Sequence, residues 1–261
     1  MDAIMAYLQG WRESVRRGVS GWGNAIGSRY AAALKLVATD CPLCQGSAQG
    51  GGLCRGCAAD VVLSMRLAQA RCSVCCLALG QYSACPDCAQ QSPAYDRIIA
   101  AFDYEALGHL LIHRFKAERR FALARTLAEM LAAAVNGNTP ALPRNTILVP
   151  VPASRASIRQ RGFNPAAEIA RYLARQLQLP YRPDLLIRSQ EGVRQKQLTR
   201  TQRAQSTLQL YSCPVRVEQA AIAVVDDVLT TGSTLHGIAG QFKAAGAVSV
   251  CGLVLARTPY R

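Results

Sequence analysis

One run of fifteen residues places the strongest limit on what this chain folds into. Residues 221–235 carry an apolar stretch, two carboxylates, a turn of hydroxyl residues and the start of a helix in direct succession. The five apolar residues 221–225 predict a short buried strand that ends at Asp226 and Asp227. A loop between a parallel strand and a helix points free backbone N–H groups at an anion, and the helix dipole strengthens the attraction. The run therefore predicts an anion-binding corner in an α/β sheet.

The side chains of this corner suit a sugar phosphate together with a divalent cation. Gly232 lets the backbone approach a phosphate closely, because glycine has no Cβ. The paired carboxylates accept hydrogen bonds from vicinal sugar hydroxyls and suit a hard cation such as Mg²⁺. The residues expected to hold the phosphate are Thr230, Thr231, Gly232, Ser233 and Thr234. No G-x-x-x-x-G-K-[ST] sequence occurs in the chain, which argues against an ATPase of the P-loop class.

The cysteines form an internal repeat. Nine of the eleven lie between Cys41 and Cys88, and eight of these nine form four C-x-x-C pairs. Nine residues separate the first pair from the second and the third from the fourth, and fourteen separate the two halves. Each C-x-x-C turn presents two thiolates to one metal, so two turns complete a tetrahedral Zn(Cys)₄ site. The predicted ligands are Cys41, Cys44, Cys54, Cys57, Cys72, Cys75, Cys85 and Cys88.

Two closed structural zinc sites are the preferred interpretation, because metal binding supplies folding free energy to a segment with few large apolar residues. Sequential pairing of the C-x-x-C turns is favoured, while a crossed arrangement that joins the first and third pairs stays open. A disulfide framework is the alternative, but residues 1–8 lack the basic start of a secretory signal, so we expect a cytoplasmic protein with reduced thiols. Cys76, Cys213 and Cys251 are left out of the ligand set.

Alternating apolar runs after the cysteine repeat predict an α/β domain. The predicted strands are residues 98–104, 146–152, 185–188, 221–225 and 248–256, and the predicted helices are residues 107–135, with a break near Glu118, and 165–177, with Asn164 as its cap. Such alternation is typical of a mainly parallel sheet, in which ligands bind at the carboxyl ends of the strands. The two prolines within 146–152 predict an edge strand or the end of a strand.

Positive charge is concentrated in one part of the chain. The whole chain has a net charge of +14, and residues 152–205 contribute eleven Lys and Arg against three Asp and Glu. This balance favours an acidic partner such as a nucleic acid or a phosphorylated metabolite. A basic loop and a helix after Pro152 predict a second anion-binding corner, and residues 189–205 predict a mobile basic loop over the site.

Two smaller clusters receive ordinary structural interpretations. His109 and His113 share a helix face, but no third ligand stands near them in the sequence, so we expect surface or interface histidines. The basic cluster of Lys116, Arg119 and Arg120 is expected to be a solvated face. No apolar run is long and clean enough to predict a membrane span.

Taken together, these features resemble the ComF family, in which an N-terminal zinc module precedes a phosphoribosyltransferase domain. The strand–acid–turn run is similar to the phosphoribosyl-pyrophosphate (PRPP) loop of type I phosphoribosyltransferases. The resemblance rests on the four C-x-x-C pairs and on residues 149–152, 161–164, 197–203 and 224–234. It implies a mainly parallel sheet of the type I phosphoribosyltransferase kind. It also implies an N-terminal extension that is partly helical (1–38), a double zinc ribbon (39–91) and a phosphoribosyltransferase-like domain (92–261).

The resemblance also implies a chemistry. Phosphoribosyltransferases displace pyrophosphate from C1 of PRPP, with Mg²⁺ bound to the substrate, through an oxocarbenium-like transition state. Asp226 and Asp227 would then be catalytic residues at the ribose hydroxyls and the metal-bound substrate. The residues implied for the pyrophosphate and for a basic closing loop are Ala153, Ser154, Arg155, Arg188, Arg194 and Lys196.

ComF proteins are linked to DNA uptake in natural transformation. The resemblance therefore implies a role with internalised single-stranded DNA, beside a helicase or recombination proteins. One alternative is a non-catalytic adaptor that grips single-stranded DNA through its basic face, with Phe163, Tyr172 and Tyr181 as candidate stacking residues. A nucleobase-salvage phosphoribosyltransferase that carries a zinc module is the other alternative.

Overall fold

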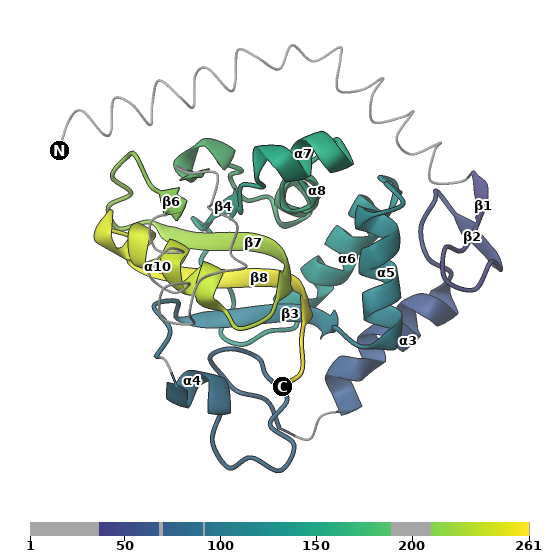
Figure 1. The fold of residues 1–261 in the computed structure, drawn as a ribbon, viewed down its shortest axis with the longest axis horizontal. Helices are drawn as coiled ribbons and strands as arrows, with labels where there is room; N and C mark the ends of the chain where they lie inside the picture. The colour runs from purple at the N-terminus through teal and green to yellow at the C-terminus, as the bar shows by residue number, and fades with distance from the viewer. Residues whose placement is uncertain (1–36, 68–69, 91, 189–209, 261) are drawn as a thin grey trace.

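The computed structural model describes residues 37–67, 70–90, 92–188 and 210–260 (Figure 1). The extension predicted over residues 1–38 therefore lies almost entirely outside the described residues, as does the predicted basic loop with Arg194 and Lys196. In Figure 1 a central sheet is covered by helices, and the cysteine-rich segments lie at its lower and right-hand sides.

Four parallel strands form the central sheet in the order β3-β8-β7-β4. They are β3 (Arg97–Asp103), β4 (Ile147–Pro150), β7 (Ala221–Leu229) and β8 (Ser249–Arg257). The predicted α/β class with a mainly parallel sheet is confirmed. The proline-bearing strand β4 lies at an edge, as expected, because proline cannot donate to a second neighbouring strand.

β7 is longer than predicted, and the prediction that it ends at the carboxylates is wrong. Asp226 and Asp227 lie inside the strand, which pairs with β8 as far as Leu229 opposite Arg257. The neighbouring β4 stops at Pro150, opposite Val225. Because β8 supplies backbone partners along its whole length, β7 continues past the end of β4 as the new edge of the sheet.

Helices cover both faces of this sheet. One core cluster packs α5 (Ala106–Lys116), α6 (Leu123–Asn136) and α8 (Pro165–Leu177) against one face. A second cluster packs α10 (Ser233–Ala244) against the other. Burial on both faces explains why the strand sequences are continuously apolar. The break predicted near Glu118 is confirmed, since α5 ends at Lys116 and α6 begins at Leu123.

The segment after β4 is partly helical where a basic loop was predicted. α7 (Arg155–Arg161) begins at Ser154, whose Oγ accepts a hydrogen bond from the Ser157 N–H at 3.1 Å. It ends at Gly162, which has a φ of 85°. The capping hydroxyl and the terminal glycine are both start and stop signals of a short helix. Asn164 then caps α8 as predicted, with Oδ1 accepting from the Ala166 N–H at 3.1 Å.

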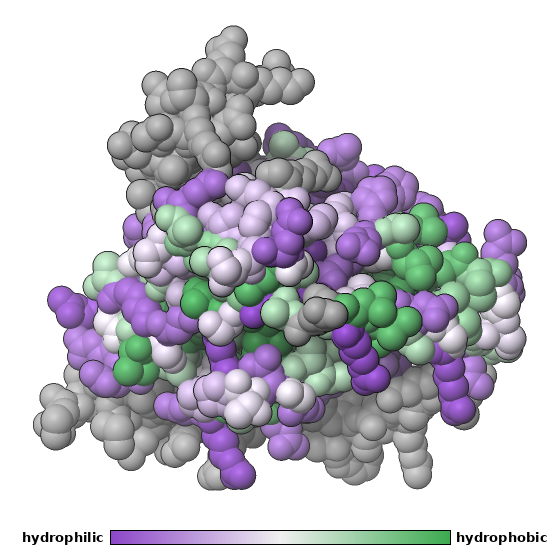
Figure 2. Space-filling model, turned by 90° about the horizontal axis from the view of Figure 1, so that it is seen from below, coloured by the Kyte–Doolittle hydropathy of each residue, from purple (hydrophilic) through white to green (hydrophobic). Residues whose placement is uncertain are grey.

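The cysteine-rich segments contain β1 (Ala38–Asp40), β2 (Ser47–Gln49), α3 (Arg55–Leu67) and α4 (Pro86–Gln90). α3 is not separate from the α/β part, because its buried Val61 belongs to the core cluster of α5 and α6. Seen from below in Figure 2, the described surface mixes hydrophilic groups with smaller apolar areas. The division at residues 91 and 92 remains a prediction.

A short antiparallel pair completes the described fold. It consists of β5 (Ile187–Arg188), which follows the single 3-10 turn η1 (Pro183–Leu185), and β6 (Tyr211–Ser212). Within the described ranges, none of the helices has both the length and the apolar character that a bilayer crossing requires.

Candidate functional site

The step at the edge of the sheet exposes the two carboxylates of β7. The Val151 N–H donates to the Val225 carbonyl at 2.9 Å, which is the last backbone contact on the β4 side. Asp226 and Asp227 follow immediately and are half-buried. Both lie near the carboxyl ends of parallel strands, where α/β sheets bind ligands.

The two carboxylates interact with each other and with a lysine from α5. The Asp227 N–H donates to Asp226 Oδ1 at 2.8 Å, and Lys116 Nζ lies 2.7 Å from Asp227 Oδ1. Burial and the neighbouring Asp227 charge together raise the pKa of Asp226 to about 7. A carboxylate that holds its proton up to about pH 7 therefore lies beside a second carboxylate that is paired with a lysine cation. The prediction that Lys116 belongs to a solvated face is therefore wrong.

The turn after β7 is open on its outer side. Thr230 and Thr231 are exposed, and Thr231 Oγ1 lies 3.1 Å from Ser233 Oγ. Gly232 is the N-cap of α10 and provides no side-chain cap, while the Ser233 N–H lies 3.5 Å from Thr231 Oγ1, so the first turn of the helix keeps N–H groups that suit an anion. Gly232 has a φ of 80°, and a Cβ there would lie 2.9 Å from the Tyr95 hydroxyl. Both its conformation and its surroundings therefore require glycine.

The second predicted corner lies at the carboxyl end of β4, beside β7. Ala153 and Ser154 are half-buried there and Arg155 is exposed. Besides capping α7, the Ser154 hydroxyl donates to Ser157 Oγ at 2.9 Å. This hydroxyl therefore holds the start of α7 in place at the corner.

Arg188 lies on β5 at the start of the predicted closing loop. Its Nη1 donates to the Tyr211 hydroxyl of β6 at 3.0 Å, and its guanidinium lies 5.5 Å from the centre of the Tyr211 ring. Burial raises the pKa of Tyr211, and the negative charge of Asp226 contributes to the same shift. Arg188 is therefore hydrogen-bonded to a tyrosine whose pKa is raised in part by the charge of Asp226.

The eight paired cysteines form two separate groups. The sulfurs of Cys41, Cys44, Cys54 and Cys57 lie within 4.8 Å of one another, and so do those of Cys72, Cys75, Cys85 and Cys88. Individual Sγ–Sγ distances are 3.7 Å for Cys44–Cys54 and 3.4 Å for Cys75–Cys85. A tetrahedral zinc with Zn–S bonds of about 2.3 Å needs sulfurs about 3.8 Å apart, so both groups fit zinc. The sequential pairing is confirmed, and the crossed arrangement is wrong.

The unassigned cysteines and the histidines do not join these groups. Within the described ranges, Cys76 belongs to neither four-cysteine group, and no third metal-ligand cluster is found. Cys251 is buried in β8, and Cys213 donates to the Val215 carbonyl. The ring centres of His109 and His113 lie 6.4 Å apart on α5.

Of the predicted stacking residues, Phe163 is not free for a base. Phe163 is only 9% exposed, because its ring lies between Phe115 and Phe121 at centroid distances of 5.3 Å and 4.7 Å. Tyr172 and Tyr181 are half-buried against the core. Phe121, which packs on Phe163, is an exposed ring, with 52% of its surface accessible. Nothing in the sequence indicated that Phe121 rather than Phe163 would be exposed, because the two rings come together only in the tertiary structure.

Known proteins that are similar to this chain extend over most of its length. A competence protein F of Haemophilus influenzae is 30% identical over 213 residues, which cover 78% of this chain and 91% of that protein. The chain belongs to the ComF family. A DNA utilization protein YhgH of Salmonella typhi is 30% identical to this ComF chain over 210 residues, covering 79% of it and 91% of the relative. The YhgH protein of Escherichia coli K12 is 29% identical over 176 residues, 67% and 78% of the two chains.

The other comparisons add little to the ComF assignment. No family model matches the chain. A hypoxanthine phosphoribosyl transferase of Trypanosoma cruzi is similar in structure with a TM-score of 0.30 and 18% identity, covering 51% of this chain and 62% of that one. An asparagine mutant of an invariant aspartic acid in HPRTs gives a TM-score of 0.32, with 19% identity over 51% and 65% of the two chains. These likenesses are distant and assign no residue of the ComF chain a role.

Two candidate residues of this ComF chain were absent from the sequence-based predictions. Lys116 was placed in a basic surface cluster, and Arg257 was not selected at all. Each stands at the end of an apolar helix or strand at the carboxyl side of the sheet. A charge directly after an apolar run is a weak signal for such positions, because the run brings its end to the edge where ligands bind.

Proposed function

We propose that this chain binds Mg²⁺–PRPP at the corner between β7 and α10 and acts as a phosphoribosyltransferase-domain protein. The observation that carries the proposal is the carboxylate pair of Asp226 and Asp227 at the step in the sheet, which residues 228–232 connect to the N-terminus of α10 at Gly232. Along the chain, carboxylates that suit ribose hydroxyls and a metal are therefore followed by N–H and hydroxyl donors that suit a phosphate.

The proposal gives each part of the site a task. The 5′-phosphate binds the turn and the first N–H groups of α10, and the ribose hydroxyls face Asp226 and Asp227. The pyrophosphate faces the β4–α7 corner and Arg155, with Arg188 and Lys116 as nearby cations. Mg²⁺ carried by the substrate offsets the charge of the leaving pyrophosphate. Lys116 leaves Asp227 for the pyrophosphate when the ligand enters.

The biological setting follows from the relatives. Proteins named for competence and for DNA utilization are 30% identical to this chain over 78% and 79% of its length. We therefore propose that the site serves the handling of internalised single-stranded DNA, with proteins of DNA uptake as partners. The net charge of +14 supports a polyanionic partner.

The test is calorimetric titration of zinc-loaded protein with PRPP and Mg²⁺. Asp227→Asn removes one carboxylate and the Lys116 ion pair, and we expect it to weaken binding at least about tenfold, which corresponds to about 1.4 kcal/mol. Asp60→Asn, an exposed carboxylate on α3, is the matched control and should bind like the parent protein. Equal affinity of the parent and Asp227→Asn would contradict the proposed site.

Direct binding of single-stranded DNA is the second candidate function. The exposed Phe121 packs on Phe163, and Arg119 donates to the Gln160 carbonyl, which holds the α5–α6 loop against basic α7. An exposed ring among arginines is a typical platform for an unpaired base. Here the ligand would be gripped mainly through its phosphates.

Fluorescence anisotropy with a labelled single-stranded oligonucleotide tests this second function. We expect the affinity to fall steeply as salt increases, because phosphate contacts release counterions. Phe121→Ala should weaken binding by about 1–3 kcal/mol through lost stacking. Val215→Ala removes a similarly exposed apolar side chain elsewhere and is the control. An affinity that changes neither with salt concentration nor with Phe121→Ala would argue against this function.

A further inference from the structure

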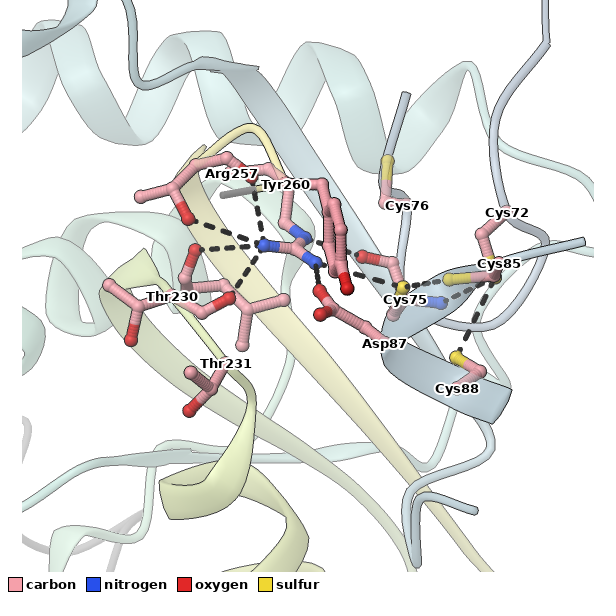
Figure 3. Close-up of polar contacts among 12 residues, drawn as sticks. Cys72, Cys75, Cys76, Cys85, Asp87, Cys88, Thr230, Thr231, Arg257 and Tyr260 are labelled. Atoms are coloured by element: carbon pink, nitrogen blue, oxygen red, sulfur yellow. Dashed lines mark hydrogen bonds and ion pairs between the residues drawn. The ribbon is translucent and has the colours of Figure 1, made fainter. Parts of the chain in front are cut away.

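Arg257 links the second cysteine group to the body of the protein. Of the residues that the structure describes, it is the one charged residue that is buried, with 1% of its surface exposed. Its Nε donates to the Cys75 carbonyl at 3.1 Å, and its Nη2 faces Cys75 Sγ at 3.8 Å. The same Nη2 donates to the Asp87 carboxylate, which lies inside the Cys85–Cys88 turn (Figure 3).

The other side of the same guanidinium binds the start of the turn of residues 230–234, which we call the phosphate turn. Nη1 donates to the Thr230 carbonyl at 2.6 Å and lies 3.4 Å from the Leu229 carbonyl. Figure 3 shows the guanidinium between Thr230 and the Cys75 turn. The fork geometry of arginine allows one side chain to bind both partners at once, which a lysine cannot do.

We propose that Arg257 is a positioning residue through which metal occupancy of the second cysteine group controls the geometry of the phosphate-binding turn. Bound metal fixes the two C-x-x-C turns, and these hold Asp87 and the Cys75 carbonyl in place for the guanidinium. Arg257 then fixes the carbonyls of Leu229 and Thr230, so that the following hydroxyls and N–H groups keep their direction. The phosphate ligand in this inference rests on the proposed function, whereas the coupling between metal and turn does not.

Besides Arg257, Tyr95 also connects the second cysteine group to the turn. Tyr95 lies just after the second cysteine group and is buried, and its hydroxyl lies against Gly232 of the turn. Cys75, Leu77 and Tyr95 share a core cluster with Leu229 and Leu235, which flank that turn. The turn is thus packed on the cysteine segment as well as hydrogen-bonded to it.

The first cysteine group is a built-in control. Hydrogen bonds to its sulfurs come from the backbone N–H groups of Gly46 and Cys57 among the residues described. Gly51 and Gly52, which lie between its two C-x-x-C turns, face Ala122 and Thr126 at the start of α6. Metal loss there should leave the phosphate turn unchanged. Coupling to a ligand at the turn must also be reciprocal, so the ligand should slow metal loss from the second group only.

Hydrogen exchange of the full chain, without PRPP, tests the coupling directly. Cys88→Ser removes a ligand of the second group without touching a contact of Arg257, and Cys57→Ser is its counterpart in the first group. We expect Cys88→Ser, with one zinc left, to raise the exchange rate of the amides of residues 229–235 at least tenfold. Cys57→Ser should change it less than twofold. Equal exchange at this turn in both variants would overturn the proposal.

Asp87→Asn tests the link with both zinc ions retained. It should raise exchange in the turn while the amides of β3 remain unchanged, because the guanidinium loses its charged partner. Arg257→Lys should do the same, and in either variant an unchanged turn with two zinc ions bound would overturn the proposal. In the parent protein, PRPP with Mg²⁺ should slow chelator-driven zinc release from the second group, and this slowing should vanish in Arg257→Lys. If PRPP binds no variant, the proposed function fails, while the exchange data still decide the coupling.

Discussion

At the scale of single residues, the carboxylate pair is the most unusual feature of the molecule. Two adjacent acids in a strand normally point to opposite faces, and here the backbone N–H of Asp227 also donates to Asp226 Oδ1. Lys116 balances the negative charge of Asp227 directly, because its Nζ lies 2.7 Å from Asp227 Oδ1. Asp226 is left with burial and a like charge beside it, and both raise its pKa to about 7. The site thus keeps a proton that a bound cation would have to displace.

This raised pKa predicts how stability depends on pH. The folded state holds the proton of Asp226 more tightly than the unfolded state, in which an aspartate has a pKa of about 3.9. The contribution of Asp226 is therefore fully present below about pH 4 and is lost as pH rises towards 7. Denaturant titrations of the zinc-loaded protein at about pH 5.5 and 7.5 should show a smaller loss of stability for Asp226→Asn than for the parent. An identical loss in both proteins would count against the raised pKa.

At the scale of elements, the residues that cap the helices determine the position of the basic side chains that follow β4. Ser154 and Asn164 each cap a helix: Ser154 begins α7 where a basic loop was predicted, and Asn164 begins the predicted helix α8. The Asn164 side chain also donates from Nδ2 to the Val151 carbonyl at 2.9 Å. This asparagine therefore joins the end of β4 to the start of α8 and shapes the second anion corner.

Removing this cap should destabilise the protein measurably. Asn164→Ala loses the accepted bond from the Ala166 N–H and the bond to Val151, so we expect a loss of about 1–2 kcal/mol in the free energy of unfolding. Asn145→Ala, at an exposed position before β4, is the control and should be nearly neutral. Equilibrium denaturation compares the two variants. Similar stabilities would mean that the cap contributes little.

At the scale of the whole molecule, the two metal groups fasten the cysteine segments to different parts of the α/β body. The first group lies near the N-terminal end of α6, and the second lies beneath the phosphate turn. Figure 1 shows β1 and β2 beside α5 and α3, and α4 below the sheet. The exposed or half-buried character of most cysteines means that metal, more than apolar burial, holds these segments.

Zinc removal should therefore lower the thermal stability of the whole chain. We expect a strong chelator to reduce the midpoint of thermal unfolding by several degrees, because a few kcal/mol of stabilisation corresponds to roughly 2–4 °C for each kcal/mol in a chain of this size. Adding zinc back under reducing conditions should restore it. A midpoint that does not move after metal analysis has shown complete zinc loss would contradict this expectation.

The sequence by itself determined the local parts of this protein. The apolar runs predicted the strands of the parallel sheet, the prolines marked β4 as an edge, and Asn164 marked the start of α8. The C-x-x-C spacing predicted the eight cysteines that form two groups able to hold a metal ion. These features succeed because they depend on neighbours within a few positions, where spacing along the chain fixes spacing in space.

Tertiary structure alone decided which distant groups meet. It chose sequential over crossed cysteine groups and let β7 continue past the end of β4, because β8 supplied its partners. It also brought Lys116 to Asp227 and placed Arg257 between a metal group and the phosphate turn. Long-range packing of a sheet edge determines such pairs, and no local pattern encodes it. The proposed chemistry depends on these encounters as much as on the motif that first suggested it.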